Sequence, residues 1–201
     1  MRRIGTIILG FALLSTASAV AEDTRSEVSL EGSGFFTKES NNRGVTQRAT
    51  NAGGFLVGYR YHFNNWFAAE ANYGYGRDTQ GYLNTSGFSR IQSNVHEATA
   101  AFVVTPPITV AKLRPFLLAG SGALVFDPRN GSGTSIAGAQ RQAKAAFLYG
   151  GGADYNLTQH LALRAEYRGL VYKAPDFNLR SLNTDKVTHV AQPSAGVVIR
   201  F

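Results

Sequence analysis

The stretch Val187–Phe201, VTHVAQPSAGVVIRF, decides how the rest of the chain is interpreted. Its second half alternates, so an extended strand would carry Ala195, Val197, Ile199 and Phe201 on one face. Chains rarely end on a large apolar side chain that faces water. In a closed barrel, however, neighbouring strands satisfy the backbone while the outer side chains contact acyl tails. The stretch therefore predicts a lipid-facing β-strand.

The N-terminal residues have the pattern of a secretory signal peptide. Two arginines precede the apolar run Ile4–Leu14, and the small residues that follow offer cleavage sites after Ala19 or Ala21. A transmembrane anchor is the alternative, but this run is shorter than the ~20 apolar residues that span a bilayer. We expect residues 1–21 to be a signal peptide and residues 22–201 to form one domain.

The composition is compatible with an exported barrel. The chain has no cysteine, which excludes disulfides, thiolate metal sites and cysteine nucleophiles and leaves packing and strand pairing as the sources of stability. Its mean hydropathy is close to neutral, a value that also suits a soluble protein. A barrel gives the same average, because lipid-facing and lumen-facing side chains alternate along each strand.

Period-two alternation recurs along the chain and puts aromatic residues on one parity. Two neighbouring segments show it best, with Phe55, Val57, Tyr59, Tyr61 and Phe63 in the first and Phe67, Ala69, Ala71, Tyr73 and Tyr75 in the second. The pair Asn64-Asn65 between them is a short turn of the kind that closes a hairpin. The alternate parity carries charged residues, so we expect aromatic side chains outside and charged side chains inside.

Further strands are expected at residues 27–37, 93–105, 113–126, 147–155, 161–168 and 187–201. In the first, Val28, Leu30 and Phe36 should face lipid and Glu31 and Ser33 the interior. Residues 113–126 cannot be oriented, because the run Phe116–Gly120 supports either parity. The total is eight strands.

The connections between these strands alternate in length. Short ones at residues 64–65, 106–112 and 156–160 alternate with long polar ones at residues 38–49, 77–92, 127–142 and 173–186. Outer-membrane barrels have short periplasmic turns and longer external loops. The sequence therefore predicts an all-β fold, an eight-stranded antiparallel up-and-down transmembrane β-barrel with four long external loops. A soluble lipocalin-like barrel with its apolar face inward is the alternative.

These residues resemble the eight-stranded outer-membrane β-barrel superfamily, which includes OmpA-type and opacity-type surface proteins. The most specific likeness is the last strand, in which Ser194, Gly196, Ile199 and Phe201 are similar to the signal read by the outer-membrane assembly machinery. The penultimate hairpin, Gly150–Tyr155 with Leu161–Arg168, is also similar. We expect no peptidoglycan-binding domain after the barrel, so the wall-anchoring role of OmpA-type proteins is not expected to transfer. Pro193 removes one ladder donor and suggests a bend or bulge at the seam between first and last strands.

The inward charges are the best candidate site. They include Arg60, Glu70, Glu97, Arg164, Glu166 and Arg168. Because side chains largely fill the interior of an eight-stranded barrel, these residues should pair with one another. The alternative is a polar pore or a proton path. We favour a plug of ion pairs.

Hydrolytic or cofactor chemistry has little support in the sequence. The histidines His62, His96, His160 and His189 lack metal-ligand spacing. A lipid A-modifying enzyme would need a His and a Ser on one face, but His189 and Ser194 are an odd number apart, as are Ser93 and His96. Only a bulge at Pro193 would bring His189 and Ser194 together. We expect no catalytic residue, no metal and no cofactor.

The long external segments are rich in basic residues, namely Lys38, Arg43, Arg48, Arg77, Arg90, Arg129, Arg141, Lys144, Lys173, Arg180 and Lys186. At the outer rim they would meet the phosphates of lipopolysaccharide. Export makes nucleic-acid binding improbable. We expect a non-enzymatic surface barrel with an envelope or adhesion role, whose partners are membrane lipid, lipopolysaccharide, the assembly machinery and a host or surface ligand of the loops. A narrow pore and a lipid A-modifying enzyme are the alternatives.

Overall fold

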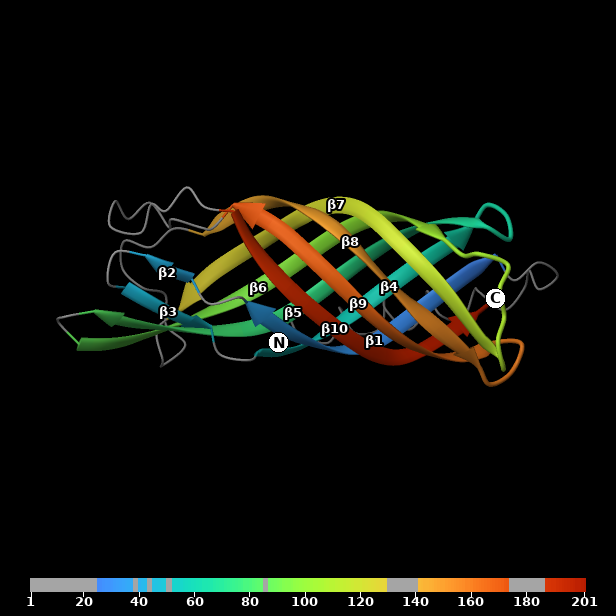
Figure 1. The fold of residues 1–201 in the computed structure, drawn as a ribbon, viewed down its shortest axis with the longest axis horizontal. Helices are drawn as coiled ribbons and strands as arrows, with labels where there is room; N and C mark the ends of the chain where they lie inside the picture. Colours follow the sequence, from blue (N-terminus) through green and yellow to red (C-terminus); the bar gives the residue numbers. More distant parts are fainter. Residues whose placement is uncertain are drawn as a thin grey trace, which may run out of the picture.

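Eight long antiparallel strands form a closed barrel (Figure 1). The computed structural model describes residues 25–37, 40–42, 45–49, 52–84, 87–129, 141–173 and 187–201, so the predicted signal peptide lies outside the described residues. The barrel strands are β1 (Ser26–Thr37), β4 (Ala52–His62), β5 (Phe67–Asn84), β6 (Gly87–Val104), β7 (Leu113–Arg129), β8 (Gln142–Asn156), β9 (Leu161–Lys173) and β10 (Val187–Arg200). No helix among these residues has the length and apolar character needed to cross a bilayer.

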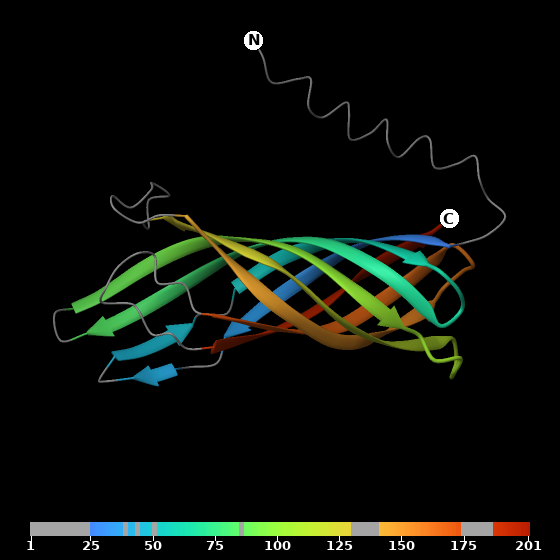
Figure 2. The same ribbon diagram turned by 90° about the horizontal axis from the view of Figure 1, so that it is seen from above.

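Each strand pairs with its neighbour along the chain, and β1 pairs with β10 to close the ring. The short turns and the C-terminus lie at one end of the barrel (Figures 1 and 2). In the first turn, the side chain of Asn64 accepts hydrogen bonds from the backbone N–H groups of Trp66 and Phe67, at 2.8 and 2.9 Å. The eight-stranded up-and-down prediction is confirmed.

The opposite, external end contains more strand than predicted. β5 and β6 stay paired from Phe67↔Val104 to Asn84↔Gly87, so the expectation of a loop over residues 77–92 is wrong. The short strands β2 (Ser40–Asn42) and β3 (Val45–Ala49) lie within the expected loop 38–49, and β3 pairs with β5. Sequence alternation does not reveal such strands. A hairpin outside the bilayer needs no row of lipid-facing apolar side chains, which is the signal that marks the other strands.

The alternation along the strands separates an apolar outer wall from an inner wall that carries the charges. Phe102 is 72% exposed and Leu117 is 66% exposed on the outside. On β7, which could not be oriented from sequence, Phe116 and Leu118 are buried inside and Leu117 faces outward. A soluble barrel would require the opposite arrangement, with the charges outside.

Pro193 interrupts the seam between β1 and β10 without shifting it. The pairs Ser33↔Ser194 and Phe36↔Ala191 flank the interruption, and both belong to the same register. No residue is inserted, so the bulge that the sequence left open is absent. The β10 ladder with β9 continues through Pro193↔Tyr167. The missing N–H therefore affects only the β1 side of the strand.

Candidate functional site in the barrel lumen

Inward positions of seven strands bring charged side chains together in the lumen. The luminal cluster consists of Glu27 and Glu31 on β1, Arg60 on β4, Glu70 on β5, Glu97 on β6, Asp154 on β8, Arg164, Glu166 and Arg168 on β9, and Arg200 on β10. All are buried, and Arg168 is 0% exposed. All six residues singled out from the sequence therefore lie in one cluster.

The part of the cluster nearest the short turns is built around two arginines. Arg164 donates from Nε to Asp154 Oδ1 at 2.7 Å and from Nη2 to Glu27 Oε2 at 2.9 Å. Arg60 donates from Nε to Glu70 Oε2 at 2.6 Å. The Phe116 ring on β7 lies 4.2 Å from the Arg60 guanidinium carbon and 5.0 Å from that of Arg164. The strand without a charge in the cluster thus supplies an aromatic face to the cations.

The middle of the lumen is built around Arg168. Its Nη2 donates to Thr99 Oγ1 at 2.7 Å, and its Nη1 lies 3.4 Å from Glu97 Oε1. Gln192 on β10 donates to Glu97 Oε2 at 2.9 Å. Arg60 Nη2 lies 3.9 Å from Glu166 Oε2, which joins the two parts into one network. The network therefore links strands from all sides of the barrel.

The six candidates from the sequence leave out four charged members of this network, namely Glu27, Glu31, Asp154 and Arg200. Arg200 donates to Glu27 Oε1 at 2.8 Å and to Asp154 Oδ2 at 3.0 Å, and Ser194 donates to Glu31 Oε2 at 2.7 Å. The parity that places Glu31 inside also places Glu27 inside, and the parity opposite to Ile199 places Arg200 inside. This signal was available at both strand ends.

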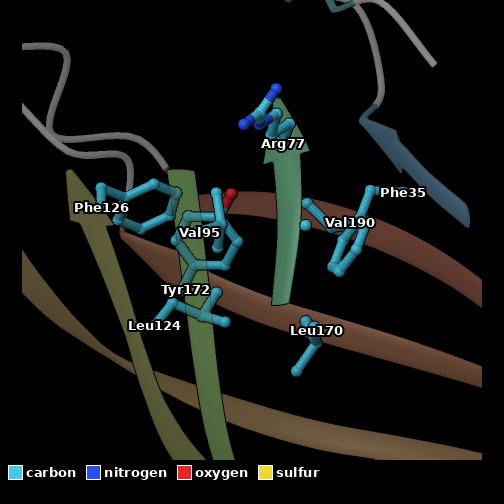
Figure 3. Close-up of a pocket in the computed structure, with 9 residues that line it drawn as sticks. Phe35, Arg77, Val95, Leu124, Phe126, Leu170, Tyr172 and Val190 are labelled. Atoms are coloured by element: carbon cyan, nitrogen blue, oxygen red, sulfur yellow. The ribbon is translucent and has the colours of Figure 1, made fainter. Parts of the chain in front are cut away.

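Above the ions, toward the external end, the lumen is apolar. A small pocket of about 20 Å³ opens there, shown in Figure 3 and lined by Phe35, Gly76, Arg77, Val95, Leu124, Phe126, Leu170, Tyr172 and Val190. Figure 3 shows Arg77 at its upper edge, above the apolar side chains. Leu148, which is 0% exposed, belongs to the same buried apolar cluster as these side chains. Apolar groups therefore fill the lumen between the luminal cluster and the exterior.

The four histidines do not form a catalytic or metal-binding group. His62 Nε2 lies 3.0 Å from Glu27 Oε1, and His160 is exposed in a turn. His189 belongs to the outer face of β10, whereas Ser194 is buried on its inner face. Within the described ranges, no three His, Asp or Glu side chains converge as metal ligands would. The luminal cluster is thus an arrangement that holds charges in place.

The predicted assembly signal occupies the seam. Ile199 is half exposed on the outer wall, while Ser194 is buried and bonded to Glu31. Phe201 and Ser26 exchange backbone hydrogen bonds of 2.9 and 3.0 Å. All four signal residues thus pair with residues of β1. Gly196, for example, lies opposite Glu31.

The structure describes the side chains of only some basic residues of the long segments. Arg77, Arg141 and Lys173 are exposed and Lys144 is half-buried. Lys38, Arg43, Arg180 and Lys186 lie outside the described residues, and the side chains of Arg48, Arg90 and Arg129 do as well.

Solved structures with this architecture include three outer-membrane proteins. Ail of Yersinia pestis, in complex with the heparin analogue sucrose octasulfate, is 20% identical, with 88% of this chain and 98% of Ail covered and a TM-score of 0.55. OprG from Pseudomonas aeruginosa is 12% identical, with coverages of 88% and 95% and a TM-score of 0.64. Neisserial surface protein A is 15% identical, with coverages of 88% and 97% and a TM-score of 0.62.

At such low identity these structures establish the fold and nothing finer. No curated protein sequence matches the chain. The family model for the outer membrane protein beta-barrel domain, in contrast, matches residues 7–201. Because that match covers nearly the whole chain, the protein belongs to the outer membrane protein β-barrel domain family and is a bacterial outer-membrane protein.

Proposed function

We propose that this protein is a non-enzymatic surface barrel that supports the envelope and presents its external hairpins to anionic ligands. The observation that carries the proposal is the filled lumen. Charged side chains that bond to one another occupy the part of the lumen toward the short turns. Apolar side chains occupy the part toward the external end. A barrel filled in this way offers its outside and its external end for function.

A narrow pore is the first competitor, and the lumen argues against it. A passing ion would have to cross the apolar layer formed by residues such as Leu124, Leu148 and Leu170, where it would lose its hydration without compensation. It would also have to displace arginines that are already paired with carboxylates. We therefore expect silent recordings from planar bilayers. Steady conductance that changes when Arg164 or Glu70 is neutralised would overturn this part of the proposal.

The external hairpins support the choice of ligand. β5 and β6 continue as a paired ribbon to Asn84 and Gly87, and β3 pairs alongside. The segments that join the strands at this end are rich in Lys and Arg. Ail, which has the same fold, was crystallised with a heparin analogue. Sulfated polysaccharide at a host surface and lipopolysaccharide phosphate both present the dense negative charge that such segments attract.

The adhesion proposal is tested with cells that display the protein. Cells are counted on heparin-coated and on uncharged dextran-coated surfaces. A trimmed variant deletes residues 79–92 and joins the paired residues Asp78 and Ser93 through an Asn-Gly turn. We expect intact protein to retain cells on heparin only, and trimmed protein to lose part of this retention, because the deletion removes Arg90 together with the ribbon that presents it. Heat-modifiable gel migration confirms that both barrels fold. Equal retention by the trimmed variant would contradict the role of the ribbon.

A lipid A-modifying enzyme is the second competitor. It predicts an altered lipid A mass spectrum in cells that express the protein, abolished by His189→Ala. We expect an unchanged spectrum, since His189 and Ser194 lie on opposite faces of β10. A mass shift that depends on His189 would establish an enzyme.

We also propose that the last strand is the part read by the assembly machinery. Its lipid-facing Ile199 and its terminal Phe201 follow the pattern that such machinery reads. Deleting Phe201 should lower the amount of folded barrel in the outer membrane, while Phe201→Tyr should restore it. Equal amounts for all three proteins would reject the assignment.

A further inference from the structure

Two tyrosine–histidine pairs lie on the outer wall of the barrel. Tyr73 Oη lies 2.8 Å from His96 Nδ1, and Tyr149 Oη lies 2.8 Å from His189 Nε2. Tyr73 is 46% exposed and Tyr149 is 39% exposed, so both contact the surroundings of the barrel. The first pair joins the adjacent strands β5 and β6, and the second joins β8 and β10, between which β9 lies. Neither takes part in the luminal cluster.

Each pair is held in place by its neighbours. The Tyr75 ring packs on His96 with a centroid distance of 5.1 Å. The second pair reaches from β8 to β10 across Gly169 of β9, where a Cβ atom would lie 2.5 Å from Cζ of Tyr149. Only glycine lets the tyrosine ring lie flat over the middle strand. Tyr149 and His189 then stack with their ring planes 29° apart.

Both histidines lie near the external edge of the lipid-facing band. A strand tilted by 35–45° climbs about 2.5 Å per residue, which puts His96 about 20 Å above Val104 and His189 about 27 Å above Arg200. The apolar band of such barrels is about 25 Å tall. His96 therefore lies just inside the external edge of this band, and His189 lies just beyond it.

A basic residue follows each pair at the next outward position toward the exterior. On β5, Arg77 succeeds Tyr75, which is the ladder partner of His96. On β9, Lys173 succeeds Val171, which is the ladder partner of His189. Arg77 and Lys173 are exposed, and no described residue forms an ion pair with either. Lys173 thus accompanies the second pair on the outer wall, and Arg77, which also lines the luminal pocket, lies at the external rim beside the first pair.

Hydrogen-bond accounting leaves each pair with an unused donor. A neutral imidazole has one N–H and one acceptor nitrogen. If the tyrosine donates, the second histidine N–H is free; if the histidine donates, the tyrosine O–H is free. No other described side chain bonds to either histidine. At the external edge of the lipid-facing band, the phosphate oxygens of a lipid headgroup are suitable acceptors for this donor.

We propose that each Tyr–His pair, with Arg77 or Lys173 above it, binds a phosphate of lipid A in the external leaflet. Phosphate oxygens accept the free donor in a charge-assisted bond, and the neighbouring cation neutralises the group. The site belongs to the barrel wall. It stands independently of the adhesion role proposed for the external hairpins.

The test measures lipid binding to the refolded full-length mature barrel by native mass spectrometry. The probes are bisphosphorylated lipid A, the same lipid A after enzymatic dephosphorylation, and phosphatidylglycerol. We expect bisphosphorylated lipid A to bind about tenfold more tightly than either other probe, the size of effect that a charge-assisted bond with a cation supplies. In the double variant His96→Phe/His189→Phe, the preference should fall to within about twofold.

His160→Phe is the matched control, because His160 is equally a surface histidine but lies in a turn at the other end of the barrel. It should keep the full preference. Wild-type protein with no preference, or a double variant that retains it, would overturn the proposal. Equal binding of phosphatidylglycerol would overturn the assignment to lipid A.

A second measurement covers a double variant that fails to fold. In wild-type barrel with labelled imidazoles, lipid A should shift the nitrogen resonances of His96 and His189 and leave those of His160 unchanged. Uniform shifts, or none, would count against the site.

Discussion

The two halves of the lumen are filled in different ways, and they show how a barrel with a narrow interior combines specificity with closure. Toward the short turns, charged side chains from six strands bond to one another around Arg60 and Arg164. Toward the exterior, Leu148, Leu170 and Phe126 pack in an apolar layer. Apolar side chains tolerate rearrangement, whereas each ionic contact requires a defined partner. We infer that the ionic half favours one order of strands around the barrel. The apolar half closes the lumen toward the exterior.

The charges of the ionic half are not balanced. The cluster holds the carboxylates Glu27, Glu31, Glu70, Glu97, Asp154 and Glu166 against the guanidiniums Arg60, Arg164, Arg168 and Arg200. Both Glu166 carboxylate oxygens are buried without a hydrogen bond in the structure. Removing an arginine increases the imbalance, while removing a carboxylate reduces it. Loss of an arginine should therefore cost more stability than loss of Glu166.

The largest effect is expected for Arg164→Met. The substitution removes a cation that lies within 3.6 Å of Glu70 and bonds to Glu27 and Asp154 in a buried site, and leaves these carboxylates to Arg60 and Arg200. The free energy of unfolding should fall by about 3 to 5 kcal/mol. Urea titration of the barrel in lipid vesicles, followed by tryptophan fluorescence and heat-modifiable migration, measures the change. Lys173→Met removes an exposed charge and serves as control; equal losses in both variants would contradict a buried network.

A somewhat smaller loss is expected for Leu148→Ala in the apolar half. Leu148 is fully buried, so truncation removes apolar contacts and leaves a cavity. The free energy of unfolding should fall by about 3 kcal/mol. The same vesicle titration applies. Leu148→Met should cost much less, since it keeps the volume. If both variants were as stable as wild type, the outer part of the lumen would not be packed as described.

The pair Arg60 and Glu70 allows the ionic half to be tested by a double-mutant cycle. Arg60→Leu and Glu70→Leu each leave one partner buried and uncompensated, whereas the double variant removes both charges. The double variant should be more stable than the sum of the single losses predicts, by about 2 kcal/mol. Additive losses would show that the 2.6 Å contact between these side chains carries no coupling.

The smallest effect is expected for Glu166→Gln. The side chain makes no hydrogen bond in the structure, and its nearest guanidinium contacts are 3.4 Å to Arg168 and 3.9 Å to Arg60. Neutralising it reduces the excess of carboxylates, so stability should change by less than about 1 kcal/mol. A loss comparable to that of Arg164→Met would show that the imbalance is compensated elsewhere.

Parity along the strands predicted much of this molecule. The alternation around Arg60, Glu70 and Arg164 placed these residues inside, because a strand that faces lipid on one side leaves only the other side for charge. The same rule failed for residues 113–126, where apolar residues occupy both faces since β7 lines an apolar part of the lumen. It also failed above the rim, where the continuation of β5 and β6 has no apolar row to mark it.

The pairing of individual side chains lay beyond sequence reasoning. Arg60 and Glu70 are cross-strand partners and could be matched through the hairpin at Asn64. Glu27 and Arg164, in contrast, lie on strands that are not adjacent. Their contact depends on the width of the lumen and on how far the arginine extends across it. The same is true of Tyr149 and His189, which meet only because Gly169 between them has no side chain.

The ribbon of β5 and β6 has a backbone edge as well as a paired side. β6 pairs with β7 only as far as Gln92↔Arg129, so beyond that point residues 87–91 have no described strand on their other side. An unpaired edge of this kind can accept an extended peptide as an additional strand, through main-chain hydrogen bonds that depend little on sequence. Substitutions within residues 87–91 would then leave the capacity for strand addition intact.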